Sequence, residues 1–369
     1  MLNRDVYVKA PEQNRPVNNG VAEVSEDHSD AAQQVLRHEL ETFVCDGQYQ
    51  KGMETILDTF LRNLGSGTEQ PGMWISGFYG SGKSHLAKML RHLWTDFSFP
   101  GGATARGLAK LPPPVSDALR EATTAGKRYG GLHAAAGKLG AGAGDHVRLA
   151  LMGIVFKSAG LPEAYAHAQF VMWLRREGLL SAVEADLKEA GRSLAEELPH
   201  LYVSPRIAKA LLKAYPGFAE SETAARALLK AQFPQVQDVS NEQMVNAITE
   251  ALSDGGNFPL TLVVLDEVQQ YIGNDVEKAY MVQEVTESLC KHFTGKLLFI
   301  GTGQSALSGM PNLMRLMGRF PVPIMLSDVD VENVTRQIIL AKKPSSRPLV
   351  ELSWRSNLGE ISRHLRGTK

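Results

Sequence analysis

The sequence contains few cysteines and no long apolar run, and each absence narrows the class of protein that it encodes. Cys45 and Cys290 are far apart and form no metal or redox spacing, so we expect two reduced thiols, in the core or on the surface. No run approaches the roughly 18 apolar residues of a transmembrane helix. Residues 1–20 lack the apolar stretch of a secretory signal. The sequence therefore predicts a cytoplasmic protein with no membrane contact.

The sequence also lacks a surplus of charge of either sign. Its 369 residues include 39 Lys and Arg and 40 Asp and Glu, which gives a net charge of −1. No overall basic field therefore indicates nucleic-acid binding, although local basic patches, and with them DNA contacts, remain open. None of the ten histidines has the spacing of a zinc site, so we predict no zinc.

One glycine-rich stretch organises the rest of the chain. An apolar run at residues 73–75 leads into residues 77–84, which fit G-x-x-x-x-G-K-[ST] at every fixed position, and a helical pattern follows. Such a loop turns backbone N–H groups toward an anion, and the helix N-terminus adds partial positive charge. We therefore predict a site for ATP and Mg²⁺, in which Lys83 reaches the β- and γ-phosphates and the Ser84 hydroxyl holds the metal. The alternative is a plain glycine turn with Lys83 on the surface.

The whole loop is expected to contact the nucleotide. Phe78 and Tyr79 would pack around the nucleotide or neighbouring loops, and His85 is interpreted as a helix surface residue rather than a catalytic one. The candidate nucleotide-binding residues are Gly77, Phe78, Tyr79, Gly80, Ser81, Gly82, Lys83, Ser84 and His85.

A carboxylate pair follows a second apolar run. Asp266 and Glu267 come directly after residues 260–265, whose apolar residues are typical of a parallel strand that is buried on both faces. In this Walker-B position Asp266 would hold Mg²⁺, and Glu267 would orient and polarise the attacking water. The alternative is a solvated strand end.

Polar residues after the next strand pattern extend the candidate site. Thr302 and Gln304 stand where a side chain can sense the γ-phosphate, and the sequence leaves open which of them does so. Arg315 and Arg319 precede the last strand pattern, and Arg319 is the better candidate for a finger that enters a neighbouring subunit's site. The alternatives are a strand-end turn for Thr302 and a local ion pair for the arginines.

The remaining patterns predict a three-layer α/β P-loop NTPase fold with a parallel sheet and a helical preface before the first strand. As in additional-strand ATPases of the AAA+ type, we expect one strand to separate the Walker-B strand from the P-loop strand. A glycine-rich strand is expected over 130–139, and a helix capped by Asp145 follows it. Helix starts are expected at Ser29, Ser181, Ser204, Ser221 and Ser240. The predicted parts are an extended arm (1–28), a P-loop domain (29–159 and 256–330), a helical insertion (160–255) and a partial helical lid (331–369).

Several phrases together are similar to a known family. The sequence resembles the BrxC/PglY family, the P-loop ATPase component of BREX bacteriophage-exclusion systems. The phrases that carry the resemblance are GVAEVSEDH, FVCDGQYQKGMETILDTFLRNL, GMWISGFYGSGKSHLAKML, LTLVVLDEVQQYIG and LLFIGTGQSALSG. The resemblance runs through most of residues 1–343. It implies an AAA+-like ATPase in antiviral defence, acting with other BREX components that include a DNA methyltransferase, and forming a homo-oligomer in its full-length form.

The chain also departs from the family pattern. Family members are much longer, so we expect this chain to be the N-terminal ATPase part with a truncated lid. Residues 344–357 read as patchy, and Arg363 in the family-like phrase GEISRHLRGTK is a candidate second sensor. Rival functions are a nucleotide-gated scaffold with little turnover, a small-molecule kinase, and an origin-recognition-like ATPase, which would require a winged-helix domain.

Overall fold

The structure, a computed structural model, describes residues 3–8, 24, 29–139, 146–307, 311–327, 332 and 334–366. A five-stranded sheet in the order β2-β3-β4-β1-β5 forms its centre, and all neighbouring strands are parallel. The strands are β1 (Met73–Ser76), β2 (Leu132–Lys138), β3 (Leu260–Asp266), β4 (Leu297–Gly303) and β5 (Val322–Met325). The predicted α/β class, the parallel sheet and the single strand between β3 and β1 are confirmed.

Helices cover both faces of the sheet because the central strands are apolar on both faces. Every residue of β1, β3 and β4 is buried. Ile75 and Val264 belong to one core, with α2 (Asp30–Glu41), α3 (Gly47–Ser66), α4 (Lys83–Thr95) and α6 (Pro113–Gly126). Trp74 and Val263 belong to the other, with α7 (Val147–Ser158), α13 (Asn241–Leu252) and α15 (Val276–His292).

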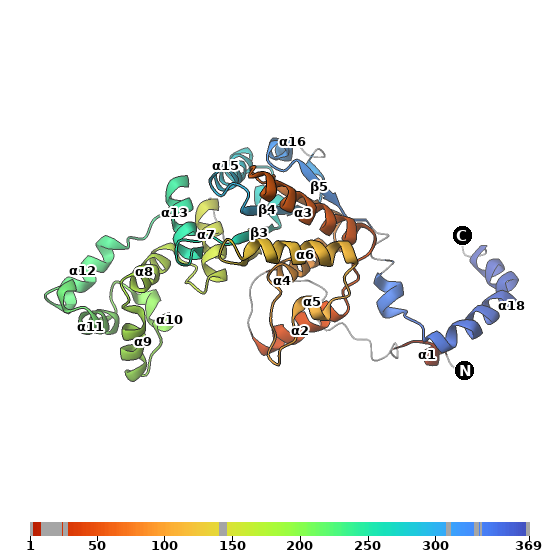
Figure 1. Cartoon of the computed structure of the whole chain (residues 1–369), viewed down its shortest axis with the longest axis horizontal. Helices are drawn as coiled ribbons and strands as arrows, with labels where there is room; N and C mark the ends of the chain where they lie inside the picture. Colours follow the sequence, from red (N-terminus) through yellow and green to blue (C-terminus); the bar gives the residue numbers. More distant parts are fainter. Residues whose placement is uncertain are drawn as a thin grey trace.

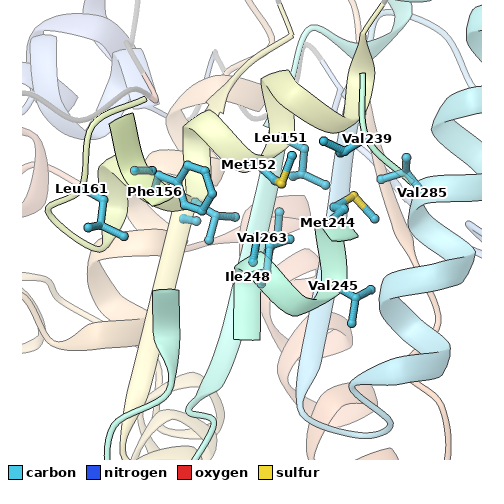
Figure 2. Close-up of a cluster of buried hydrophobic side chains, with 14 of the residues drawn as sticks. Leu151, Met152, Phe156, Leu161, Val239, Met244, Val245, Ile248, Val263 and Val285 are labelled. Carbon is cyan, nitrogen blue, oxygen red and sulfur yellow. The ribbon is translucent and has the colours of Figure 1, made fainter. Parts of the chain in front are cut away.

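The second core joins the sheet to the helices that follow β2. Figure 2 shows Val263 of β3 among side chains of α7, α13 and α15. The labelled members of this cluster are Leu151, Met152, Phe156, Leu161, Val239, Met244, Val245, Ile248, Val263 and Val285. Burial of a large aliphatic or aromatic side chain stabilises a fold by roughly 1.5–3 kcal/mol, so α7 and α13 are fixed firmly to the sheet.

Between α7 and α13 the chain forms a helical region that lies away from the sheet (Figure 1). It contains α8 (Tyr165–Arg176), α9 (Leu180–Glu189), α10 (Leu194–Glu197), α11 (Pro205–Ala214) and α12 (Glu222–Gln232). Short turns η3 (Leu198–His200) and η4 (Pro216–Phe218) connect them. Its buried side chains continue the second core, so this region is anchored to the α/β body rather than tethered by a bare linker.

Serine caps set most of the helix starts, as predicted. The hydroxyls of Ser204, Ser221 and Ser240 accept hydrogen bonds from backbone N–H groups in the first turns of α11, α12 and α13, and Ser29 does so for α2. The expected start at Ser181 is wrong, because α9 begins at Leu180 without a side-chain cap. An apolar residue precedes Ser181, so packing rather than capping decides where this helix begins.

Other predicted elements are found near their expected positions. The glycine-rich strand over 130–139 is β2, and the helix after it is α7; its expected cap, Asp145, lies outside the described residues. The remaining short helices are α5 (Ala105–Leu108), α14 (Val268–Ile272) and α16 (Pro311–Met314), with the turn η6 (Arg315–Gly318) after α16.

Both ends of the described chain lie on one side of the molecule (Figure 1). A short helix, α1 (Asn3–Val6), which the extended-arm prediction did not include, precedes a bridge between Tyr7 and Lys342. The π-helical turn η7 (Thr335–Ile339) and the turn η8 (Pro344–Ser346) lead to α18 (Arg347–Arg366). The expectation of an irregular stretch over 344–357 is therefore wrong, since beyond Pro348 no proline interrupts helix formation there.

Candidate active site

The parallel strands bring the predicted motifs to one edge of the sheet. β1 ends at Ser76, just before the glycine loop, and β3 ends at Asp266. β4 lies between them, with Thr302 level with Ile75. In open parallel sheets ligands bind outside the carboxyl ends of the strands. The order of the strands therefore places the P-loop, Thr302 and the Asp266–Glu267 pair side by side.

The glycine loop ends at a helix N-terminus whose amides are not capped. Gly80 and Gly82 have φ angles of +85° and +84°, which residues with a side chain rarely adopt. Gly82 is the N-cap of α4, and a glycine has no side chain that could cap the helix. The first N–H groups of a helix have no partner within it, so those of α4 are available to an anion such as a phosphate.

Lys83 lies over the loop from the first position of α4. Its ammonium group donates hydrogen bonds to the backbone oxygens of Gly77, at 2.8 Å, and Phe78, at 2.9 Å. Burial lowers the pKa of Lys83, and the nearby Asp266 carboxylate opposes that shift. The Asp266 carboxylate is thus near enough to Lys83 to act on its charge. Lys83 is thus partly buried against the loop and not fully extended into solvent.

Two hydroxyls accompany Lys83. Ser84 follows it in the first turn of α4 and is half-buried. The Ser81 side chain is fully buried, and its Oγ has no hydrogen-bond partner within the described part of the chain. A buried hydroxyl without a partner is unusual and indicates a position where a ligand or water completes the bonding.

Asp266 and Thr302 form the buried centre of the site. Asp266 is 1% exposed, and its Oδ1 accepts a hydrogen bond of 2.5 Å from the Thr302 hydroxyl. Thr302 Oγ1 in turn accepts a hydrogen bond of 3.0 Å from the backbone N–H of Glu267. Asp266 Oδ2 is buried and has no partner among the described residues. Thr302 therefore lies within β4 and ties the Walker-B pair together, instead of capping the turn that follows.

Glu267 has a strained backbone and a charged neighbour that the sequence did not suggest. Its φ of +60° lies in the left-handed region, which is uncommon for a residue other than glycine and often marks a functional position. Its carboxylate Oε1 is 3.3 Å from Lys138 Nζ, and both side chains are about one-third exposed, at 32% and 34%. Lys138 ends β2 in register with Asp266, so only the strand pairing could have revealed it.

The loop after β4 is fixed from two sides, which the sequence also did not predict. The Ser305 backbone N–H donates to the Gln269 side chain at 2.9 Å, and the Ser305 oxygen accepts from Trp74 Nε1 at 3.0 Å. Gln304 lies between this anchor and Gly303 and is exposed. A Cβ atom at Gly303 would come within 2.3 Å of the Trp74 ring. The anchored loop thus presents Gln304 to solvent at the carboxyl edge of β4.

The aromatic residues of the loop and His85 point in different directions. Phe78 and Tyr79 are 47% and 82% exposed, so Tyr79 in particular is directed largely to solvent. His85 is not a plain surface residue. Its ring is half-buried and meets Phe43 edge-on, with the ring centroids 5.7 Å apart. Burial is the largest cause that lowers the pKa of His85. It therefore belongs to the contact between α4 and the segment that follows α2.

Of the candidate arginines, Arg319 lies at the other end of the sheet from the glycine loop of its own chain. Arg319 precedes β5, at the amino end of the sheet, since Val322 pairs with Met73. Its guanidinium group is 2.6 Å from Glu287 Oε1 and 3.7 Å from Glu69 Oε1. Arg315 is exposed in η6, and Arg363 is exposed in α18. Arg319 therefore does not complete the site within this chain.

The donor set suits Mg²⁺ better than a metal that needs a protein cage. Within the described residues no group of three or more His, Cys, Asp and Glu side chains could hold a metal ion. Mg²⁺ needs no such group, because it keeps several waters and binds one or two carboxylates together with substrate phosphates. The unpartnered Asp266 Oδ2 and the Ser84 hydroxyl are the groups that fit it here.

Comparison with family models gives no match for the chain, and comparison with solved structures gives no significant match. Among the described helices, none combines the length and apolar character that crossing a bilayer requires.

Proposed function

We propose that the chain binds ATP with Mg²⁺ at the carboxyl edge of the sheet and hydrolyses it to ADP and phosphate. One observation carries the proposal: the buried, unpartnered Oδ2 of Asp266 lies at the same edge as the uncapped N-terminus of α4 with Lys83. A buried carboxylate oxygen without a partner is costly. A cation shared between this oxygen and a phosphate would satisfy it.

Each side chain then has a role that follows from its position. Lys83 exchanges its loop carbonyls for the β- and γ-phosphate oxygens, while Ser84 and Asp266 hold Mg²⁺, which when bound neutralises charge on those oxygens. Glu267 orients a water and accepts its proton as the water oxygen bonds to the γ-phosphorus and the bond to ADP breaks. Thr302 keeps Asp266 and the Glu267 backbone in place.

Three further residues have supporting roles in the proposal. Gln304 senses the γ-phosphate from the anchored loop after β4, in preference to Thr302, whose hydroxyl is already used by Asp266 and Glu267. Phe78 and Tyr79 are free to cover a bound nucleotide because they are exposed.

The biological setting is proposed from the sequence resemblance. The BrxC/PglY-like phrases support an AAA+-type ATPase of bacteriophage defence that couples ATP turnover to the assembly or remodelling of a complex on DNA. In that setting the partners are further copies of the chain and other BREX components, including a DNA methyltransferase.

A second function has one observation in its favour. The ion pair between Lys138 and Glu267 draws the carboxylate toward β2, which lies on the opposite side of β3 from the P-loop strand. A protein in which this pair persists after ATP binds would be a nucleotide-gated scaffold with little turnover.

The test measures nucleotide affinity and phosphate release for the full chain and two variants. Lys83→Ala should weaken ATP binding about 10- to 150-fold, since charge-assisted hydrogen bonds contribute about 1.5–3 kcal/mol. Glu267→Gln should bind ATP and Mg²⁺ normally and lose turnover by about 10²–10⁴-fold, because an amide cannot take the proton of water. Lys110→Ala, at an exposed lysine away from the motifs, serves as the control.

The outcomes separate the two functions. Tight ATP binding without phosphate release in the unaltered chain would favour the scaffold. Equal ATP affinity in Lys83→Ala and Lys110→Ala would show that the glycine loop is not the nucleotide site.

A further inference from the structure

A tyrosine from the helices that precede the sheet reaches the glycine loop. Tyr49, in α3, is 5% exposed, and its hydroxyl donates a hydrogen bond of 3.0 Å to the backbone oxygen of Ser81. The contact with Gly82 is so close that a Cβ atom at this residue would lie 1.6 Å from the Tyr49 oxygen. Gly82 is therefore required both by its φ angle and by the side chain that lies against it.

This hydrogen bond fixes the orientation of one peptide group in the loop. Ser81 C=O and Gly82 N–H belong to the same planar trans peptide, so they point in opposite directions. Because the oxygen points to Tyr49, the Gly82 N–H points away from α3. The Gly82 N–H donates to no backbone oxygen among the described residues. It lies next to the uncapped first turn of α4, where phosphate would bind.

Further contacts hold the same helices against the start of α4. The Phe43 ring meets Tyr49 and His85 edge-on, with centroid distances of 6.2 and 5.7 Å. Glu39 in α2 forms an ion pair of 2.7 Å with Lys88 in α4, and both side chains are largely buried. The Tyr49 hydroxyl thus belongs to a packed contact between α2, α3 and the start of α4.

We infer that Tyr49 is a positioning residue for phosphate binding, and that α2 and α3 are part of the nucleotide site rather than only a cover for the sheet. The inference rests on the proposed function. By holding the Ser81 carbonyl, Tyr49 keeps the Gly82 N–H directed at the β-phosphate, so the loop is organised before the nucleotide arrives. The substrate class that depends on Tyr49 is nucleoside di- and triphosphates, whereas a monophosphate has no phosphate at that position.

The experiment compares Tyr49→Phe with Tyr202→Phe in the full chain. Tyr202 is a matched control, because its partly buried hydroxyl also donates to a backbone oxygen, that of Phe233 at 2.5 Å, in the helical region away from the sheet. Affinities for ATP, ADP and AMP with Mg²⁺ are measured by calorimetry, together with kcat, KM and thermal unfolding.

Tyr49→Phe should weaken ATP and ADP binding about three- to tenfold, the effect of losing one hydrogen bond. AMP affinity should not change, and KM for ATP should rise while kcat stays within about twofold. Tyr202→Phe should leave all three affinities unchanged, even where its thermal unfolding shifts as much as that of Tyr49→Phe.

Two results would overturn the inference, and they differ from a failure of the proposed function. Unchanged ADP affinity in Tyr49→Phe, or an equal loss for ADP and AMP, would reduce Tyr49 to a packing residue. If the unaltered chain binds neither ATP nor ADP, the proposed function is wrong and the inference fails with it.

Discussion

Glu267 combines a backbone strain and a side-chain restraint in one residue. A left-handed backbone at a residue with a side chain costs roughly 1–2 kcal/mol, so it persists only where the surroundings enforce it. Here the Thr302 hydroxyl accepts a hydrogen bond from the Glu267 N–H, and Lys138 forms an ion pair with the Glu267 carboxylate. The backbone is thus fixed next to Asp266, while the carboxylate can exchange one partner for another.

Replacement of Lys138 tests what that exchange costs. In Lys138→Met the carboxylate no longer has its partner on β2, so we expect turnover to rise at unchanged ATP affinity. The increase should be at most about fivefold, since partly exposed ion pairs contribute up to about 1 kcal/mol. Steady-state phosphate release under saturating ATP measures it, and Lys138→Arg, which keeps the charge, is the control. A fall in turnover would mean instead that Lys138 supports the catalytic position of Glu267.

At the scale of elements, β2 is an outer strand of the sheet beside β3, and it carries a partly buried histidine. His133 Nε2 is 2.8 Å from the Ser158 hydroxyl of α7. Burial, and to a lesser extent the charge of Arg91, lowers the pKa of His133 from 6.5 to about 4. The residue is therefore neutral in the folded protein over a range of pH in which the unfolded chain takes up a proton.

This difference predicts a pH dependence of stability with a definite sign. The pKa of His133 is about 4 in the folded protein and close to the ordinary 6.5 in the unfolded chain. The contribution of the neutral His133 to the free energy of unfolding should therefore be lost as pH falls from about 6.5 toward 4. Between pH 7 and pH 5 the wild type should lose about 2 kcal/mol more of its free energy of unfolding than His133→Gln. Urea unfolding at the two pH values measures this, and equal losses in both proteins would contradict it.

For the whole molecule, the open question is whether each site is completed by a neighbouring chain. Arg319 is held at the amino end of the sheet by Glu287 and Glu69, and it cannot serve the P-loop edge of its own chain from there. A role as a finger therefore requires a second copy and requires Arg319 to leave Glu287. Arginine suits such a role because its planar fork pairs with phosphate oxygens and always keeps its charge.

Two variants separate the finger from a structural ion pair. Arg319→Ala should bind ATP normally but lose turnover, by up to about 10³–10⁵-fold for a fully engaged finger. Glu287→Gln removes the nearer of the two intrachain partners and keeps the arginine, so it should retain turnover. Turnover per chain should also rise with protein concentration, and mixing Arg319→Ala with Lys83→Ala should restore part of it. If Arg319→Ala and Glu287→Gln have the same turnover, and turnover per chain does not depend on protein concentration, Arg319 has a structural role only.

Local patterns in the sequence determined most of the elements and selected the candidate residues of the proposed nucleotide site. The glycine loop, the apolar runs before Asp266 and Thr302, and the serine caps each depend on contacts within a few residues or on burial over one strand. Such signals can be read without knowing the fold. They supported the parallel sheet, and they selected Lys83, Ser84, Asp266 and Glu267, whereas the expected strand between β3 and β1 came from the likeness to additional-strand ATPases.

Only the tertiary structure decided which distant groups complete that site. Lys138 meets Glu267 because β2 pairs with β3, and Tyr49 reaches Ser81 because α3 packs beneath the loop. Thr302 donates a hydrogen bond to Asp266 because β4 lies next to β3, and Arg319 forms an ion pair with Glu287 at the opposite end of the sheet. These contacts join residues far apart in the chain, and their side chains follow no local periodicity. Strand order and helix packing, which depend on the burial of the whole apolar surface, place them.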